Sequence, residues 1–131
     1  MSVTHSTASK DLATNAVVDQ LDGAASKLKF RISPSTVASP GTAAATLTFA
    51  TPAFGASSAG TATAGAIASD TAATGNGSAV TFASLETSAG TVAIHCAVAA
   101  AASDINMTGG LTIGAGDTVS CSSLTYAALS A

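Results

Sequence analysis

The chain has very few large side chains from which to build a hydrophobic core. Trp is absent, Tyr occurs once and Phe four times among 131 residues, so Ala, Val, Ile and Leu must fill the interior. Small side chains make thin layers, which suit closely packed β-sheets better than a wide helical bundle. Because a chain of this length has room for one core, we expect residues 1–131 to form a single β-rich domain.

Apolar residues alternate with small or polar ones along much of residues 27–126. The clearest strand is predicted at residues 91–98, where one face carries Val92, Ile94, Cys96 and Val98. Further strands are predicted at 27–32, 45–49, 61–68, 79–85, 105–113 and 118–126, with turns at Pro40-Gly41, Asn76-Gly77 and 114–117. About seven or eight short strands predict a mainly β fold, an antiparallel β-sandwich or a jelly-roll-like barrel.

One short helix is predicted at residues 6–23, ahead of the strands. Ser6 or Thr7 can cap its first turn, and Gly23 supplies its stop. Its core-facing side is predicted to carry the apolar residues that recur at helical spacing, namely Leu12, Ala13, Ala16, Val17 and Leu21. Residues 1–5 precede the helix as an extended arm.

Charged residues are scarce and concentrated near the N-terminus. Only 8% of the residues are charged, against about a quarter in typical domains. After Arg31 the charges are only Asp70, Glu86, Asp104 and Asp117. Low charge permits close contact between surfaces. We therefore favour a subunit that functions packed among neighbours, and a neutral exported or surface protein is the alternative.

Two N-terminal features are candidates for contact with a partner. Lys27, Lys29 and Arg31 alternate with apolar residues and give one strand a basic outer face. This face is either a solvated strand surface or a basic patch for an acidic partner. The second candidate is the arm, which comprises Met1, Ser2, Val3, Thr4 and His5.

Composition argues against several classes of protein. Four basic residues and a net charge of −3 argue against nucleic-acid binding, which needs a basic stripe. The most apolar stretch, residues 92–102, is shorter than the about 20 residues of a membrane span. Residues 1–5 lack the basic and apolar regions of a targeting segment. We therefore expect a soluble chain that is made in the cytoplasm and has no membrane partner.

No constellation of residues indicates catalysis or a cofactor. The acidic residues form no obvious pair, and no Ser lies in a Gly-x-Ser-x-Gly setting. A Ser-His-Asp site assembled in space is the alternative. His95 and Cys96 are adjacent on a predicted strand and point to opposite faces, so they cannot share a metal ion. We expect no catalytic, cofactor-binding or metal-binding residue, and we expect Cys96 and Cys121 to be buried thiols, with a disulfide as the alternative.

Three stretches together resemble a family of small virion structural proteins from tailed bacteriophages and prophages. They are residues 6–32, which open with Ser6-Thr7-Ala8; residues 82–91, with the turn Glu86-Thr87-Ser88-Ala89-Gly90-Thr91; and residues 104–119, from Asp104-Ile105-Asn106-Met107 through Leu111-Thr112-Ile113 to Gly116-Asp117-Thr118-Val119. Their order and spacing cover most of the chain. One departure is Ile67, where relatives often carry an aromatic residue. The resemblance implies a β-sandwich virion component and carries over no catalytic residue.

Decoration or cementing of the phage head is the role that the resemblance implies. We expect a non-enzymatic protein on the capsid exterior that bridges shell subunits, with the major capsid protein as its partner and a homodimer or homotrimer as its own state. One alternative is a tail- or fibre-associated virion protein. Another is a surface- or carbohydrate-binding module, for which Tyr126 is the one Tyr that could stack on a sugar.

Overall fold

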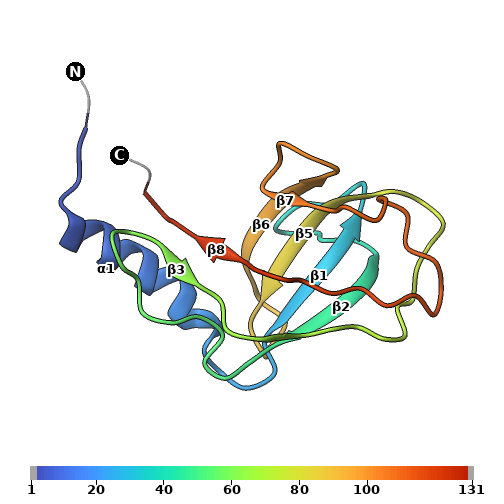
Figure 1. Ribbon diagram of the computed structural model, residues 1–131, viewed down its shortest axis with the longest axis horizontal. Helices are drawn as coiled ribbons and strands as arrows, with labels where there is room; N and C mark the ends of the chain where they lie inside the picture. Colours follow the sequence, from blue (N-terminus) through green and yellow to red (C-terminus); the bar gives the residue numbers. More distant parts are fainter. Residues whose placement is uncertain (1–2, 130–131) are drawn as a thin grey trace.

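The computed structural model describes residues 3–129, which form one curled β-sheet, a short β-ribbon and one helix (Figure 1). The predicted mainly β fold with a short N-terminal helix is confirmed. In chain order the elements are the helix α1 (Thr7–Val18), the 3₁₀ turn η1 (Asp19–Leu21) and the strands β1 (Lys27–Ile32), β2 (Ala43–Phe49), β3 (Ala62–Thr63), β4 (Ile67–Ala68), β5 (Val80–Glu86), β6 (Val92–Ala99), β7 (Ile105–Asn106) and β8 (Thr125–Tyr126).

The sheet has six strands in the order β4-β2-β1-β5-β6-β7 and curls into a half-barrel. Its long strands pair antiparallel, as predicted. Strand β7 runs parallel to β6, so this edge makes the sheet mixed. The segment that follows β6 turns back and is held beside it, because the Asp104 carboxylate accepts a hydrogen bond from Ala97 N at 2.9 Å. Strands β3 and β8 form a separate ribbon next to α1 (Figure 1).

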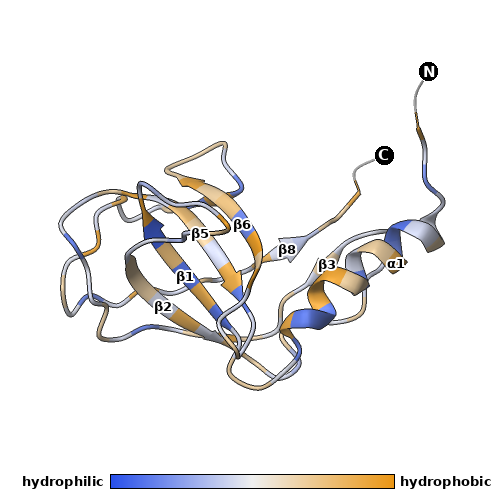
Figure 2. Cartoon of the chain, turned by 180° about the vertical axis from the view of Figure 1, so that it is seen from behind, coloured by the Kyte–Doolittle hydropathy of each residue, from blue (hydrophilic) through white to orange (hydrophobic). Residues whose placement is uncertain are grey.

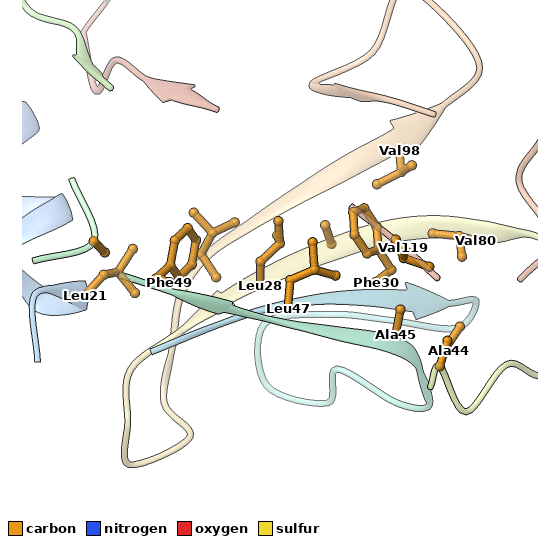
Figure 3. Packing of buried hydrophobic residues seen from close by; sticks show 14 of the residues in the cluster. Leu21, Leu28, Phe30, Ala44, Ala45, Leu47, Phe49, Val80, Val98 and Val119 are labelled. Atoms are coloured by element: carbon orange, nitrogen blue, oxygen red, sulfur yellow. The ribbon is translucent and has the colours of Figure 1, made fainter. Parts of the chain in front are cut away.

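The core lies on one face of the sheet, because alternation along each strand sends the larger apolar side chains to that face. Strand β1 alternates between hydrophobic and hydrophilic residues along its length (Figure 2). Its Leu28 lies opposite Leu47 of β2 (Figure 3) and opposite Leu85 of β5, and all three are buried. In a sandwich a second sheet would cover this face. Here the connecting segments help to cover it, through Ala53, Phe54, Ala73, Ile113 and Val119.

Helix α1 begins where predicted and ends earlier. Ser6 caps it, because Ser9 N donates to Ser6 Oγ at 3.2 Å. The α-helical hydrogen bonding stops at Val18 rather than at residue 23, and η1 continues the turn to Leu21. The last turn tightens to 3₁₀ geometry, which is common at helix ends.

The helix turns a different face to the protein than its apolar residues predict. Thr14, Val18 and Leu21 are buried, whereas Leu12 is 72% exposed and Ala16 is also exposed. The predicted core-facing side is therefore wrong at Leu12 and Ala16. Of the residues predicted to face the core, only Leu21 belongs to it; Val18, which the prediction leaves out, belongs to it as well.

Polar contacts with the turn before β3 select this face. Asp11 Oδ1 accepts hydrogen bonds from Ser57 Oγ at 2.7 Å and from Gly60 N at 2.8 Å. Asn15 Oδ1 accepts one from Ser57 N at 2.9 Å, and Thr14 Oγ1 donates to Gly60 O at 2.7 Å. Buried backbone groups need such hydrogen-bond partners. The free energy gained by pairing the backbone groups of this turn therefore exceeds the free energy that burial of the Leu12 side chain would contribute.

Candidate functional site

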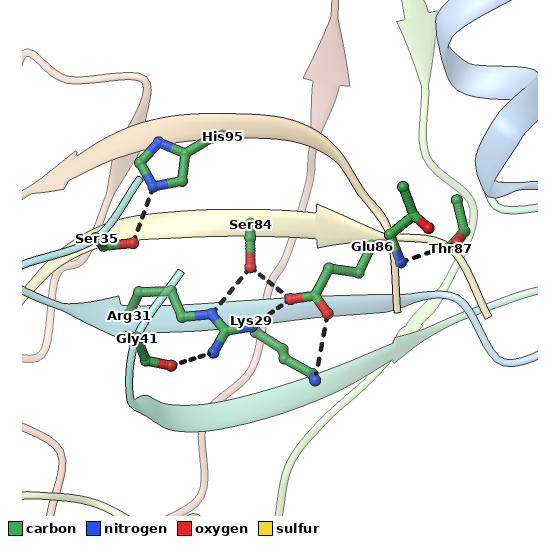
Figure 4. Close-up of polar contacts among 9 residues, drawn as sticks. Lys29, Arg31, Ser35, Gly41, Ser84, Glu86, Thr87 and His95 are labelled. Atoms are coloured by element: carbon green, nitrogen blue, oxygen red, sulfur yellow. Dashed lines mark hydrogen bonds and ion pairs between the residues drawn. The ribbon is translucent and has the colours of Figure 1, made fainter. Parts of the chain in front are cut away.

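A cluster of polar side chains lies on the face of the sheet opposite the core, across β1, β5 and β6 (Figure 4). Register places Lys29 beside Ser84, and Ser84 beside His95. We call this set the polar cluster; its members are Lys29, Arg31, Ser35, Ser84, Glu86 and His95. It is the densest group of ionisable side chains in the sheet and therefore the first candidate for chemistry.

An ion pair between Arg31 and Glu86 forms the centre of the polar cluster. The two residues are 7% and 3% exposed, and Arg31 Nη2 contacts Glu86 Oε2. Arg31 also donates from Nε to Ser84 Oγ at 3.1 Å and from Nη1 to Gly41 O at 2.7 Å. Ser84 Oγ donates to Glu86 Oε2 at 2.7 Å, and Lys29 Nζ lies 3.3 Å from Glu86 Oε1. Both oxygens of the buried Glu86 carboxylate therefore have a donor: Arg31 and Ser84 at Oε2, and Lys29 at Oε1.

The prediction of a basic outer face is wrong at Arg31, whose side chain is buried. Lys29 and Arg31 bind Glu86 within the chain, and Lys27 Nζ donates to Thr48 Oγ1 at 2.9 Å. Neither a solvated surface nor a patch for an acidic partner describes Arg31, because it is buried. One sequence signal could have identified the partner. Among the acids after Arg31, Glu86 alone directly follows a predicted strand.

The second predicted contact feature, the arm, is only partly described. Val3, Thr4 and His5 lie outside any helix or strand ahead of α1, and Val3 is 68% exposed. Met1 and Ser2, which belong to the same prediction, lie outside the described residues. The polar cluster defined above therefore includes Lys29 and Arg31 of the basic strand but none of Val3, Thr4 and His5.

Ser35 and His95 form a hydrogen-bonded pair at the edge of the polar cluster. Ser35 Oγ lies 2.9 Å from His95 Nε2, and the His95 ring packs on Phe82 with centroids 5.0 Å apart. A Ser–His contact is the start of a nucleophile–base arrangement. Within residues 3–129 no carboxylate hydrogen-bonds to His95, and Ser35 is buried. Ser35 and Gly41 both lie in the β1–β2 loop. The Ser35–His95 and Arg31–Gly41 hydrogen bonds therefore fit a role in anchoring this loop to the sheet.

The polar cluster makes stability depend on pH through Glu86. Burial raises the pKa of the Glu86 carboxyl, but hydrogen bonds from Ser84 and Arg31 and the charges of Lys29 and Arg31 together hold the pKa below its ordinary 4.5. The unfolded chain therefore takes up this proton at a higher pH than the folded one. The stabilisation is present above pH 4.5 and is lost as the pH falls toward the folded-state pKa.

We expect the urea midpoint of unfolding to be nearly constant from pH 7 to about pH 5 and to fall below that. The Glu86→Gln variant should show a shallower fall over the same acid range, because it has no proton to take up at this position. Asp11, whose pKa is lowered by hydrogen bonds from Gly60 N and Ser57, contributes equally to both proteins. Parallel pH profiles for the two proteins would contradict the prediction.

Both cysteines are free thiols, and both are half-buried. Burial, together with the nearby negative charge of Asp104, raises the pKa of Cys96 to about 11. Burial also raises the pKa of Cys121. These thiols stay protonated at neutral pH, which fits small buried hydrophobic side chains and not reactive nucleophiles.

A cavity of about 500 Å³ lies between β6 and the C-terminal segment around β8. Consecutive residues line both sides, with residues 93–96 on the β6 side and residues 124–127 on the β8 side. Leu85 and Ile105 add apolar surface, and Asp104 is the one Asp, Glu, Lys or Arg in the lining. We call this cavity the β6 slot.

Residues 3–129 contain no group of three His, Cys, Asp or Glu side chains placed to hold a metal ion. They also contain no helix long and apolar enough to cross a bilayer. No protein-family model, curated protein or solved structure matches the chain.

Proposed function

We propose that the chain is a non-enzymatic virion structural protein that decorates the capsid of a tailed bacteriophage and stabilises it by bridging subunits of the shell. The observation that carries the proposal is the way the chain uses its charges. After Arg31 all four acids bind groups of the same chain. Glu86 pairs with Arg31, and the other three accept hydrogen bonds from backbone N–H groups, namely Asp70 from Thr46, Asp104 from Ala97 and Asp117 from Gly114.

The part of the surface formed after Arg31, where all four acids are already engaged, suits close packing against other subunits. Bringing two surfaces together costs desolvation of every charged group that is not paired across the contact. Such costs are small for a surface of Ser, Thr, Ala and Gly. A cement protein needs only a moderate contact at each site, about 800 Å² per partner, because many copies act together on one shell.

The proposal is tested by locating the protein in virions whose genome encodes it. Purified particles are separated into heads and tails by mild treatment, and both fractions are quantified by mass spectrometry. We expect the chain in the head fraction, at a fixed ratio to the major capsid protein. Heads that lack the chain should release their DNA at a lower temperature than complete heads. Recovery of the chain only from tails would favour the tail-associated alternative, and its absence from virions would refute both.

A further inference from the structure

Strand β6 has an edge that is mostly unpaired. It pairs with β5 along one side, but β7 covers its other side only at Val98 and Ala99. Of the remaining edge, from Val92 to Ala97, only Ala97 N has a partner from the following segment, the Asp104 carboxylate. Within residues 3–129 no strand pairs with this part of β6. Exposed strand edges are templates for pairing with another extended chain.

The β6 slot lies along this unpaired edge. Because consecutive residues of β6 and of the β8 segment line it, both walls present backbone groups as well as side chains. β8 pairs with β3, and no second strand pairs with it among the described residues. In sheets one strand residue occupies about 160 Å³, from the rise, the strand spacing and the sheet spacing. A slot of about 500 Å³ therefore holds about three residues of an added strand.

The chemistry of the slot restricts what can enter it. Ile94, Ile105 and Leu124 favour apolar side chains on the inner side of an added strand, and Asp104 disfavours an acidic one. The arm meets both conditions. Its sequence Met1-Ser2-Val3-Thr4-His5 contains no acid and alternates Met1 and Val3 with Ser2 and Thr4.

Val3 of the same chain cannot reach past Thr14, where the slot lining ends. Ala128, which directly follows the slot lining, donates from its backbone N to Thr14 Oγ1 at 3.1 Å. Thr14 lies about 12 Å along α1 from Ser6, at 1.5 Å per residue, whereas Val3 can reach at most about 11 Å from Ser6. Figure 1 also shows the arm leaving the end of α1 that is remote from the sheet. An arm that places Val3 in the slot therefore comes from a neighbouring molecule.

We propose that the N-terminal arm of a second copy of this chain adds as a strand to β6 and fills the slot between β6 and β8. Each copy donates one arm and accepts one, so the exchange closes as a twofold dimer with two reciprocal contacts or, head to tail, as a trimeric ring. This inference concerns the isolated protein and does not rest on the proposed function.

Self-association of purified variants tests the proposal. Val3→Asp places an acid in the arm without disturbing the fold, because Val3 is 68% exposed. Sedimentation equilibrium should show association weakened at least tenfold by Val3→Asp and by deletion of residues 1–5. Val37→Asp is the matched control, because Val37 is 61% exposed in the β1–β2 loop and does not line the slot. It should associate like the wild type.

A photo-reactive residue at position 3 identifies the contact directly. We choose light-driven cross-linking over a disulfide, because the high pKa of Cys96 makes its thiol a slow partner. In a mixture of light and ¹⁵N-labelled chains, mass spectrometry should find cross-links between chains, from position 3 to residues 92–97 or 124–127. A chain that stays monomeric at millimolar concentration, an oligomer unaffected by Val3→Asp, or cross-links only within one chain would each overturn the proposal. Loss of the protein from virion heads would refute the proposed function and leave this result standing.

Discussion

Replacing Arg31 by methionine is expected to lower the free energy of unfolding by about 3 kcal/mol, measured by urea denaturation at neutral pH. Methionine keeps most of the length of the side chain and removes its charge and donors. The buried Glu86 carboxylate then loses its closest cation, and Gly41 O loses a donor. Lys29 and Ser84 stay beside Glu86, which places the loss at the lower end of the range for broken buried ion pairs.

Lys27→Met is the control for Arg31→Met. Lys27 lies on the same strand and the same face, but its ammonium donates only to Thr48 Oγ1 and it is half-exposed. We expect it to cost no more than about 1 kcal/mol. Equal losses in the two variants would show that Arg31 is not held in a buried network. A double variant, Arg31→Met with Glu86→Leu, should recover part of the loss, because it leaves no buried carboxylate without its cation.

Replacing Leu21 by alanine is expected to lower the free energy of unfolding by about 3 kcal/mol, because it empties a fully buried position. Leu21 is 0% exposed and lies beside Phe49 in the core (Figure 3). It joins the end of the helix to the sheet, so the cavity would form where two parts of the fold meet. Thermal and urea unfolding followed by circular dichroism measure the change.

Leu12→Ala is the matched control, since it makes the same substitution on the same helical segment. Leu12 is 72% exposed, so its truncation should change the free energy of unfolding by no more than about 0.5 kcal/mol. The comparison separates the two helix orientations. If the apolar residues of the segment faced the core as the sequence predicts, both truncations would be costly; a large loss at Leu12 would contradict the structure.

The long central strands could be predicted well from the sequence, and helix orientation could not. The strands predicted at 105–113 and 118–126 are wrong over most of their length, because only Ile105–Asn106 and Thr125–Tyr126 are strands there, and the strand predicted at 61–68 is two short strands, β3 and β4. The alternation in residues 27–32 and 91–98 corresponds to β1 and β6, and the turn from Glu86 to Thr91 joins β5 to β6. Helical spacing of apolar residues predicted the existence of α1. Its orientation depended on Asp11, Thr14 and Asn15, which bind a turn about 45 residues later in the chain. No local pattern carries that information.

The scarcity of large side chains and of charges predicted, by itself, a thin-layered β fold with a weakly charged surface. It did so because composition limits both the thickness of the layers and the number of charges that a surface can carry. Only the tertiary structure decided which charges remain available to a partner. Lys29 and Arg31 have no acid nearby in the sequence, yet strand pairing brings Glu86 from 55 positions beyond Arg31 to pair with both of them. The β6 slot also arises only in three dimensions, because it needs both a curled sheet and a C-terminal segment that passes beside its unpaired edge.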